Sequence, residues 1–204
     1  MALPKLNTPT YELELPSTGE KIKYRPFLVK EQKILMMAQE GKDDKELNNA
    51  MTGLVSDCTF GTVDATNSPM FDVEYIFLRV RGKSIGEKIE LNLTCEDDGK
   101  TQVPYELNLE EVNVTMDEEH STEIYIGNDV KIHFRYPYLK DMMGIPSTVN
   151  ETEKSFYVLN NCIDSIHYGD DVYKRVDISD KDVNEFVDQL TTEQFEKVMV
   201  FFNT

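Results

Sequence analysis

The sequence predicts an α+β fold in which antiparallel β-hairpins are combined with about five to six α-helices. Two observations predict this class. Short segments that alternate apolar and polar residues come in pairs, and turn-forming residues separate the members of each pair. Longer segments carry apolar residues at helical spacing, and they occupy most of the C-terminal third. With 204 residues, of which 40% are hydrophobic, the chain can bury a substantial core.

The chain begins with a predicted extended arm and a β-hairpin. Leu3–Pro9 contains two prolines, which favour extended backbone. Tyr11–Leu15 and Lys21–Tyr24 each alternate apolar and polar residues, and the turn formers Pro16–Gly19 lie between them. This arrangement predicts two antiparallel strands joined by a turn.

Three helices are predicted next. Leu28–Gln39 and Asp43–Cys58 both carry apolar residues at helical spacing. The third helix opens at Ser68 and Pro69, with serine as the expected N-cap and proline at the first helical position, and it runs through Val80. Its apolar residues lie on several faces, so we expect it to be buried on more than one side.

Two further hairpins are predicted in the middle of the chain. Ile89–Leu93 pairs with Val103–Leu109 across an Asp-Gly turn, and Glu123–Ile126 pairs with Val130–Tyr136. Pro104 cannot donate a backbone hydrogen bond, so its strand is expected at a sheet edge or at a bulge.

The C-terminal third is predicted to be mostly helical. Glu151–Ser165 forms one helix, and His167–Val176 forms a small hairpin. Two final helices start at Ser179 and at Thr191–Gln194, which has the pattern of a capping box. The last helix is apolar through Phe202, and we expect its end to lie in the core.

Three regions follow from this order of elements. Residues 1–86 hold the N-terminal hairpin and helices, residues 87–138 hold the β-hairpin region, and residues 139–204 hold the helical C-terminal region. No linker marks these limits, so a single compact unit is the alternative. No internal repeat is evident from the sequence.

The charge limits the classes of partner. The chain has 38 acidic and 21 basic residues, a formal net charge of −17 and a pI near 4.5. Nucleic acid and anionic membranes are not expected as partners, because both attract clustered Lys and Arg. Three separated cysteines do not form a disulfide scaffold, and neither a signal peptide nor a transmembrane segment is evident. We expect a protein that is made in a reducing cytoplasm and stays soluble there.

No residue pattern predicts a catalytic, cofactor or metal site. Cys95 lies at the central hairpin turn, but Asp98 occupies the position where a zinc knuckle needs a second cysteine. His120, His133 and His167 have no nucleophile at a recognisable spacing. Phosphate-binding and EF-hand loops are absent from the sequence. We therefore expect no catalytic residue, no cofactor, no bound metal and no enzymatic activity.

Binding to another protein is the function that remains, and the segment between the first hairpin and the first helix is the best candidate for the binding site. This segment is locally basic within an acidic protein, and it combines aromatic residues with arginine, as interface anchors do. The candidate partner-docking residues are Tyr24, Arg25, Phe27, Lys30 and Lys33.

Several segments are similar to a known family. Residues 7–13, 15–19 and 24–31 read NTPTYEL, LPSTG and YRPFLVKE, and residues 71–78 and 81–87 read FDVEYIFL and RGKSIGE. In order and spacing these segments resemble the T4-like bacteriophage baseplate protein family. The likeness covers residues 3–140 and continues more weakly through the helical end. That family often carries Cys-x-x-Cys at the central hairpin, and Asp98 departs from this pattern.

The resemblance implies a structural component of the central hub of a contractile phage tail baseplate. Such a protein would be part of the virion, would be assembled in the host cytoplasm, and would act by docking to other hub or tail proteins. A homo-oligomer within the assembly is left open, and no catalytic residue is implied. The alternative is a soluble hub-assembly chaperone that is absent from the mature virion. An enzyme such as a hydrolase is a third hypothesis, which would require an essential His or Cys.

Overall fold

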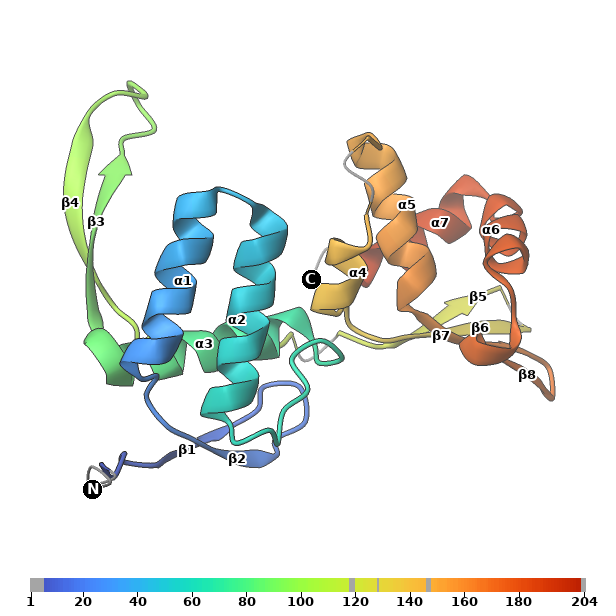
Figure 1. The fold of residues 1–204 in the computed structure, drawn as a ribbon. Helices are drawn as coiled ribbons and strands as arrows, with labels where there is room; N and C mark the ends of the chain where they lie inside the picture. Colours follow the sequence, from blue (N-terminus) through green and yellow to red (C-terminus); the bar gives the residue numbers. More distant parts are fainter. Residues whose placement is uncertain (1–5, 118–119, 128, 146–147, 203–204) are drawn as a thin grey trace. The chain divides into compact units, whose positions relative to one another are not determined.

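The computed structural model describes residues 6–117, 120–127, 129–145 and 148–202, and it confirms the α+β class (Figure 1). This part of the chain contains seven α-helices and eight strands, and every strand pair is antiparallel. The chain divides into unit 1 (Met1–Val114) and unit 2 (Thr115–Thr204). Each unit has a hydrophobic core of its own.

Unit 1 contains a β-hairpin, three helices and a second hairpin. Its elements are β1 (Tyr11–Glu14), β2 (Lys21–Tyr24), α1 (Val29–Gly41), α2 (Asp44–Cys58), α3 (Met70–Ile85), β3 (Lys88–Thr94) and β4 (Gln102–Asn108). The core forms where β1 and β2 pack on α2 and α3, burying Leu13, Ile22, Val55 and Ile76. Alternating apolar residues on the strands and helical spacing on the helices give each element one apolar side for this contact.

Unit 2 contains a four-stranded sheet in the order β5-β6-β7-β8, with helices packed on it. Its elements are β5 (Glu123–Ile126), β6 (Val130–Phe134), α4 (Leu139–Met143), α5 (Glu151–Cys162), β7 (Ile163–Tyr168), β8 (Asp171–Lys174), a 3-10 turn (Arg175–Asp177), α6 (Asp180–Asp188) and α7 (Thr192–Val200). Ile132 of β6 is buried with Leu159, Val183 and Val198 of α5, α6 and α7. These three helices therefore share one core with the sheet.

Most of the predicted elements lie where the sequence placed them, because their ends carry local signals. The hydroxyl of Ser179 accepts a hydrogen bond from the N–H of Asp182 at 3.2 Å, and α6 starts there. The hydroxyl of Thr191 accepts from the N–H of Gln194 at 3.3 Å, as its capping box predicted. Phe201, just after α7, is buried, so the expectation that this end lies in the core is confirmed.

Two local predictions were wrong, and one short helix was missed. The helix predicted for Glu151–Ser165 ends at Cys162, because the following residues pair with β6 as strand β7, and this pairing overrides the helical periodicity. Ser68 does not cap α3; its hydroxyl donates to the carbonyl of Asp64, and Pro69 takes the N-cap position. The short helix α4 was not predicted, because five residues are too few to show a helical period.

The division into two units differs from the three regions expected from the sequence. Residues 86 and 138 are boundaries of elements inside the units, at the end of α3 and the start of α4. The β3–β4 hairpin is attached to α3, because the guanidinium of Arg79 donates to the carbonyls of Leu109 and Val112 at 3.0 and 2.9 Å. Of the extended arm predicted at the N-terminus, residues 1–5 lie outside the described residues, and residues 6–10 form neither helix nor strand.

Candidate functional site

The predicted docking segment leaves β2 at Tyr24 and continues into α1. Two backbone hydrogen bonds fix its course. The N–H of Arg25 donates to the carbonyl of Cys58, at the end of α2, at 2.9 Å. The N–H of Phe27 donates to the hydroxyl of Ser84, on α3, at 2.9 Å. The segment is thus attached to two different helices of unit 1.

Glu31, in the first turn of α1, is a buried carboxylate at the centre of this segment. Its Oε1 accepts from the guanidinium of Arg25 at 2.9 Å and lies 3.1 Å from Nζ of Lys30. Its Oε2 accepts from the N–H of Leu28 at 2.7 Å. Burial raises the pKa of Glu31, but these hydrogen bonds outweigh burial and hold its pKa below the usual value. Glu31 is therefore charged at neutral pH and fixes the start of α1.

The structure places the five candidate docking residues in two groups. Tyr24 is only 3% exposed, Arg25 is bound to the buried carboxylate, and Phe27 packs against the core of unit 1. Lys30 and Lys33 are exposed on α1. The first three residues hold the segment in place from inside, and the two lysines face solvent. Docking of a partner to this segment stays a prediction.

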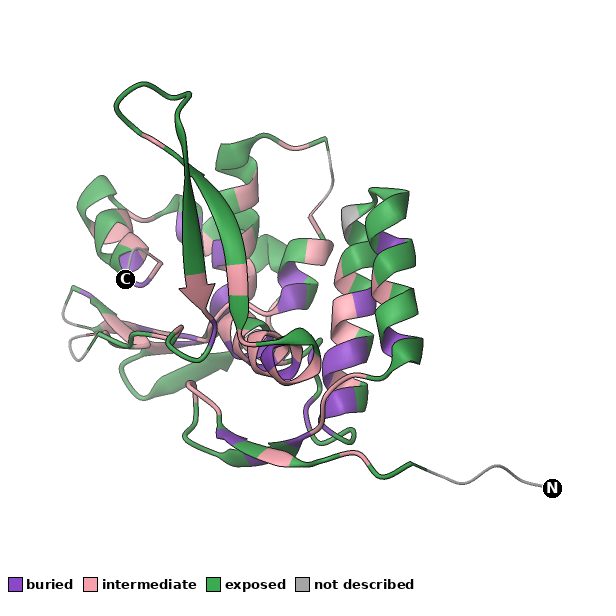
Figure 2. Ribbon diagram, turned by 90° about the vertical axis from the view of Figure 1, so that its left-hand side faces the viewer, coloured by how far each residue is buried: buried purple, intermediate pink, exposed green. Residues whose placement is uncertain are grey.

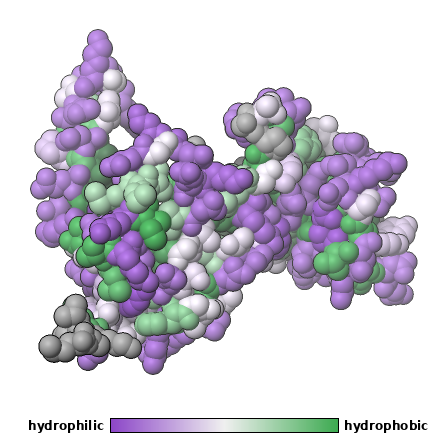
Figure 3. Space-filling view, in the orientation of Figure 1, coloured by the Kyte–Doolittle hydropathy of each residue, from purple (hydrophilic) through white to green (hydrophobic). Residues whose placement is uncertain are grey.

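Helix α1 exposes apolar side chains beside these two lysines. Val29, Ile34 and Met37 are 65%, 55% and 71% exposed. Figure 3 shows apolar side chains at the surface over this helix. An open cavity of about 280 Å³ between α1 and α2 is lined in part by Ile34. Together with Lys30 and Lys33 these residues form one stripe of the helix, here called the α1 face, and clustered exposed apolar residues are typical of interaction sites.

Unit 2 contains the same arrangement around Arg135. The N–H of Arg135 donates to the carbonyl of Cys162, at the end of α5, at 2.8 Å. Its guanidinium donates to both carboxylate oxygens of Asp141 at 2.7 and 2.9 Å. Asp141 also accepts from the N–H of Tyr138 at 2.7 Å. A hairpin, an arginine and two helices are thus joined by the same three kinds of contact as in unit 1.

The two segments correspond residue by residue. Residues 24–31, YRPFLVKE, align with residues 134–141, FRYPYLKD, and in both the acid follows the arginine by six residues. We call this arrangement the ββ–Arg–αα module, and its ion pair the arginine clamp. The expectation of no internal repeat was wrong at the level of structure. Sequence reasoning missed Arg135 and Asp141, and the signal that could have found them is the aromatic–arginine pair with its acid at fixed spacing.

His133 and His167 do not form a catalytic triad with Ser165 and Glu123. Nε2 of His133 lies 2.6 Å from Oε1 of Glu123, and Nε2 of His167 lies 3.1 Å from the hydroxyl of Ser165. In a triad the carboxylate orients the histidine that contacts the nucleophile. Here the carboxylate of Glu123 contacts one histidine and the serine contacts the other.

Two of the three thiols are buried at equivalent positions. Cys58 and Cys162 end α2 and α5, and burial raises the pKa of Cys58 to about 11 and that of Cys162 to about 12. Both thiols therefore stay protonated at neutral pH, which is the unreactive form.

The turn that carries Cys95 is closed by Asp98. Its carboxylate accepts from the hydroxyl and the N–H of Thr101 and from the N–H of Lys100, and these hydrogen bonds lower its pKa to about 2. In the residues that the structure describes, no group of three or more His, Cys, Asp or Glu is placed to hold a metal ion.

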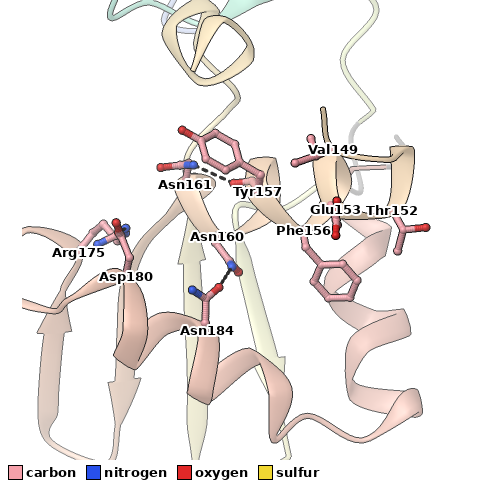
Figure 4. Close-up of a pocket in the computed structure, with 10 residues that line it drawn as sticks. All are labelled: Val149, Thr152, Glu153, Phe156, Tyr157, Asn160, Asn161, Arg175, Asp180 and Asn184. Carbon is pink, nitrogen blue, oxygen red and sulfur yellow. Dashed lines mark hydrogen bonds and ion pairs between the residues drawn. The ribbon is translucent and has the colours of Figure 1, made fainter. Parts of the chain in front are cut away.

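Unit 2 also has an open cavity of about 530 Å³ beside α5 (Figure 4). Its polar side chains bind one another: the amide of Asn160 donates to that of Asn184, and the guanidinium of Arg175 donates to the carboxylate of Asp180. The described lining residues include neither histidine nor cysteine. We assign no chemistry to this cavity.

Comparison with known proteins identifies the family. No curated protein and no solved structure matches the chain. The sequence model of one family, described as T4 bacteriophage base plate protein, matches residues 8–204. The chain belongs to this family. Its match extends over both units, including the C-terminal part where the resemblance was weakest.

Membership of the baseplate family supports a structural role in the phage baseplate and points to a component of the virion tail. It interacts in that setting with other tail or baseplate proteins. A structural family of this kind indicates a protein that is not an enzyme. Among the described residues, none of the helices is long and apolar enough to cross a bilayer.

Proposed function

We propose that this baseplate protein is a structural subunit of the central hub, which docks to other hub or tail proteins during assembly in the host cytoplasm. The observation that supports the proposal is the α1 face, where exposed Val29, Ile34 and Met37 surround Lys30 and Lys33. Burying one such apolar side chain contributes about 1.5–3 kcal/mol before the costs of association. The two lysines add a local positive charge that suits an acidic patch on the partner.

The arginine clamp gives this surface a fixed shape. Arg25 and Glu31 hold the first turn of α1, and Tyr24 and Phe27 pack behind it. A surface that is ordered before binding loses less conformational entropy on association. In this proposal Lys30 and Lys33 contact the partner, whereas Tyr24, Arg25 and Phe27 position the contact from inside the unit.

The test compares charged substitutions on two sides of α1. Ile34→Glu and Met37→Glu place a carboxylate in the α1 face, and Gln39→Glu adds the same charge on another side of the helix. We expect the first two variants to reduce incorporation into baseplates at least about tenfold, with the control near wild type. All three positions are exposed, so thermal unfolding should change little. Normal incorporation of both face variants would exclude docking through α1.

A quantitative protein inventory distinguishes the hub subunit from a departing chaperone. The formal charge of −17 favours the chaperone as the second candidate, because strong acidity keeps a small shielding protein soluble. A fixed ratio of this chain to hub proteins in both finished particles and assembly intermediates supports the resident subunit and gives its copy number. Presence in the intermediates alone supports the chaperone.

A further inference from the structure

The β3–β4 hairpin has one apolar face and one polar face. Across its antiparallel register Ile89 lies opposite Leu107, Leu91 opposite Tyr105, and Leu93 opposite Val103. The alternate positions carry polar residues and Pro104. An alternation this regular is the pattern of a strand pair that covers a core on one side.

No core lies under the outer part of that face. Leu91, Leu93, Val103 and Tyr105 are 38–51% exposed, and only the pair nearest the base is half-buried. Figure 2 shows the hairpin exposed along most of its length, and Figure 1 shows it rising from the end of α3. In the described part of unit 1, no other helix or strand packs along this face. An isolated two-stranded hairpin is marginally stable in water, so its apolar face calls for a covering surface.

The hairpin is nevertheless ordered at both ends. At its base Arg79 and Lys83 of α3 bind the chain that follows β4, and Nζ of Lys83 lies 2.6 Å from the carboxylate of Glu110. The N–H of buried Leu109 donates to the carbonyl of Glu87 at 2.7 Å. At its tip the N–H of Cys95 donates across the turn at 2.7 Å. The hairpin, here called the β3–β4 arm, is thus held at a fixed angle to α3 and presents its apolar face ready-formed.

The charge around the arm indicates what kind of surface can cover it. Residues 87–111 contain eight acidic and two basic residues, a net charge of −6. Glu90 and Glu106 are exposed on the polar face, where Lys88 binds Glu106, and Glu96 and Asp97 are exposed at the tip, beyond the end of the apolar face. The same arm of a second copy would bring an equal negative charge to the contact, and nearby like charges oppose association. A partner with lysine or arginine at the border of an apolar groove fits both features.

We propose that the β3–β4 arm inserts its apolar face into an apolar groove, bordered by basic residues, on another baseplate protein. The inference rests on the proposed function, because it names the chemistry of one hub partner. It is separate from the α1 face, which carries positive charge and would meet a different surface. With the arm and the α1 face, unit 1 has two docking sites of opposite charge.

Site-specific photocrosslinking tests the arm directly. A photoreactive amino acid is placed at Leu93 or Val103 on the apolar face, and at Asn92 or Gln102 on the polar face as matched controls, in the full chain supplied to infected cells. We expect the apolar-face positions to crosslink to another baseplate protein, at a site that contains Lys or Arg, at least about tenfold more than the controls. Crosslinks to a second copy of this chain, equal yields from both faces, or no crosslinks in assembled baseplates would each overturn the proposal.

Substitutions separate this proposal from the proposed function. Leu93→Ser with Tyr105→Ser should lower incorporation at least about tenfold. Glu96→Lys with Asp97→Lys should also lower incorporation, and this loss should be larger at low salt than at high salt. Asn92→Ser with Gln102→Ser is the control and should incorporate normally. Normal incorporation of the Leu93–Tyr105 variant overturns the arm alone. Absence of the wild-type chain from both particles and intermediates overturns the hub function itself.

Discussion

Unit 1 and unit 2 both attach a pair of helices to a β-hairpin through an arginine, but the two arginine clamps differ in geometry. In unit 2 the guanidinium of Arg135 binds both oxygens of Asp141. In unit 1 Arg25 binds one oxygen of Glu31, and Lys30 contacts the same oxygen. The two parallel hydrogen bonds in unit 2, here called the fork, require the planar guanidinium of arginine. In unit 1 two cations contact one oxygen of Glu31, so Arg25 balances only part of its charge. We therefore expect the two copies of the module to tolerate substitution of the arginine differently.

The units also differ in what surrounds the module. The hairpin of unit 2 is extended by β7 and β8 into a four-stranded sheet, while that of unit 1 stays two-stranded. Unit 1 uses additional chain for the β3–β4 arm, and its helix α1 has 13 residues where α4 has five. The exposed surfaces proposed for docking are these additions to unit 1. The shared module therefore serves folding, and the surfaces proposed for docking lie in the regions that differ between the units.

Removal of the arginine should have the largest effect. Arg135→Met removes the guanidinium that binds the buried carboxylate of Asp141. We expect a loss of about 3–5 kcal/mol in the free energy of unfolding. Arg25→Met should cost about 2–3 kcal/mol, because Lys30 remains beside Glu31. Amide hydrogen exchange, followed separately in β6–α5 and in β2–α2, measures each unit.

A double substitution controls for lost packing. Arg135→Met with Asp141→Asn removes the buried charge as well as its partner, and it should recover part of the lost stability. Equal losses below about 1 kcal/mol in both units would show that the clamp contributes no more than a surface ion pair.

Replacement of arginine by lysine should separate the two geometries. Arg135→Lys keeps the charge but loses the fork, and we expect it to cost about 1–2 kcal/mol. Arg25→Lys should cost less than about 1 kcal/mol, since only one oxygen is bound in unit 1. Urea unfolding of each variant measures the difference. A larger loss in unit 1 than in unit 2 would contradict the proposed role of the fork.

Acid should weaken unit 1 through Glu31. The folded state holds the pKa of Glu31 below its usual value of 4.5, so its contribution to stability is complete above that pH. The contribution is lost as the pH falls through the lowered pKa of the folded state. We expect the stability difference between wild type and Glu31→Gln to shrink over this range. A difference that is constant from pH 7 to pH 3 would exclude the ionised carboxylate as its source.

Thiol labelling needs no substitution, and it should compare how often each unit opens in the native protein. A thiol reagent should modify Cys95 in the native protein, while Cys58 and Cys162 react only when their unit opens. An opening free energy of about 3 kcal/mol slows the reaction about a hundredfold. Mass spectrometry of the labelled peptides then shows which unit opens first. Equal rates for all three thiols in native buffer would contradict the burial of the module.

Much of the fold could be predicted because its signals are local. The cap of Ser179 and the turns of the hairpins depend on a few neighbouring residues. The first half of strand β7, residues 163–165, could not be predicted, because its pairing with β6 depends on residues distant in sequence. The repeat was missed for a related reason: the two copies share only a few residues, chiefly an aromatic residue, an arginine, a lysine and an acid, and most of their likeness lies in the contacts that these residues make.

The sequence predicts a docking segment but does not predict which of its residues are buried. Aromatic residues with an arginine are typical of interface anchors, and the same residues build a buried clamp. The sequence does not distinguish these roles, because burial of Tyr24 and Glu31 results from the packing of α1, α2 and β2. The exposed side chains of α1 became visible only when the buried side of that helix was known.

The backbone hydrogen bond between the arginine and the end of the second helix of each module has a mechanical consequence. The N–H of Arg25 donates to the carbonyl of Cys58, and the N–H of Arg135 donates to that of Cys162. In each unit this hydrogen bond joins the two ends of the segment that contains the helical pair. Tension applied along the main chain on either side of this segment is carried by that hydrogen bond before it reaches the helices. The surface on α1 can therefore keep its shape while the strands beside it bear a load.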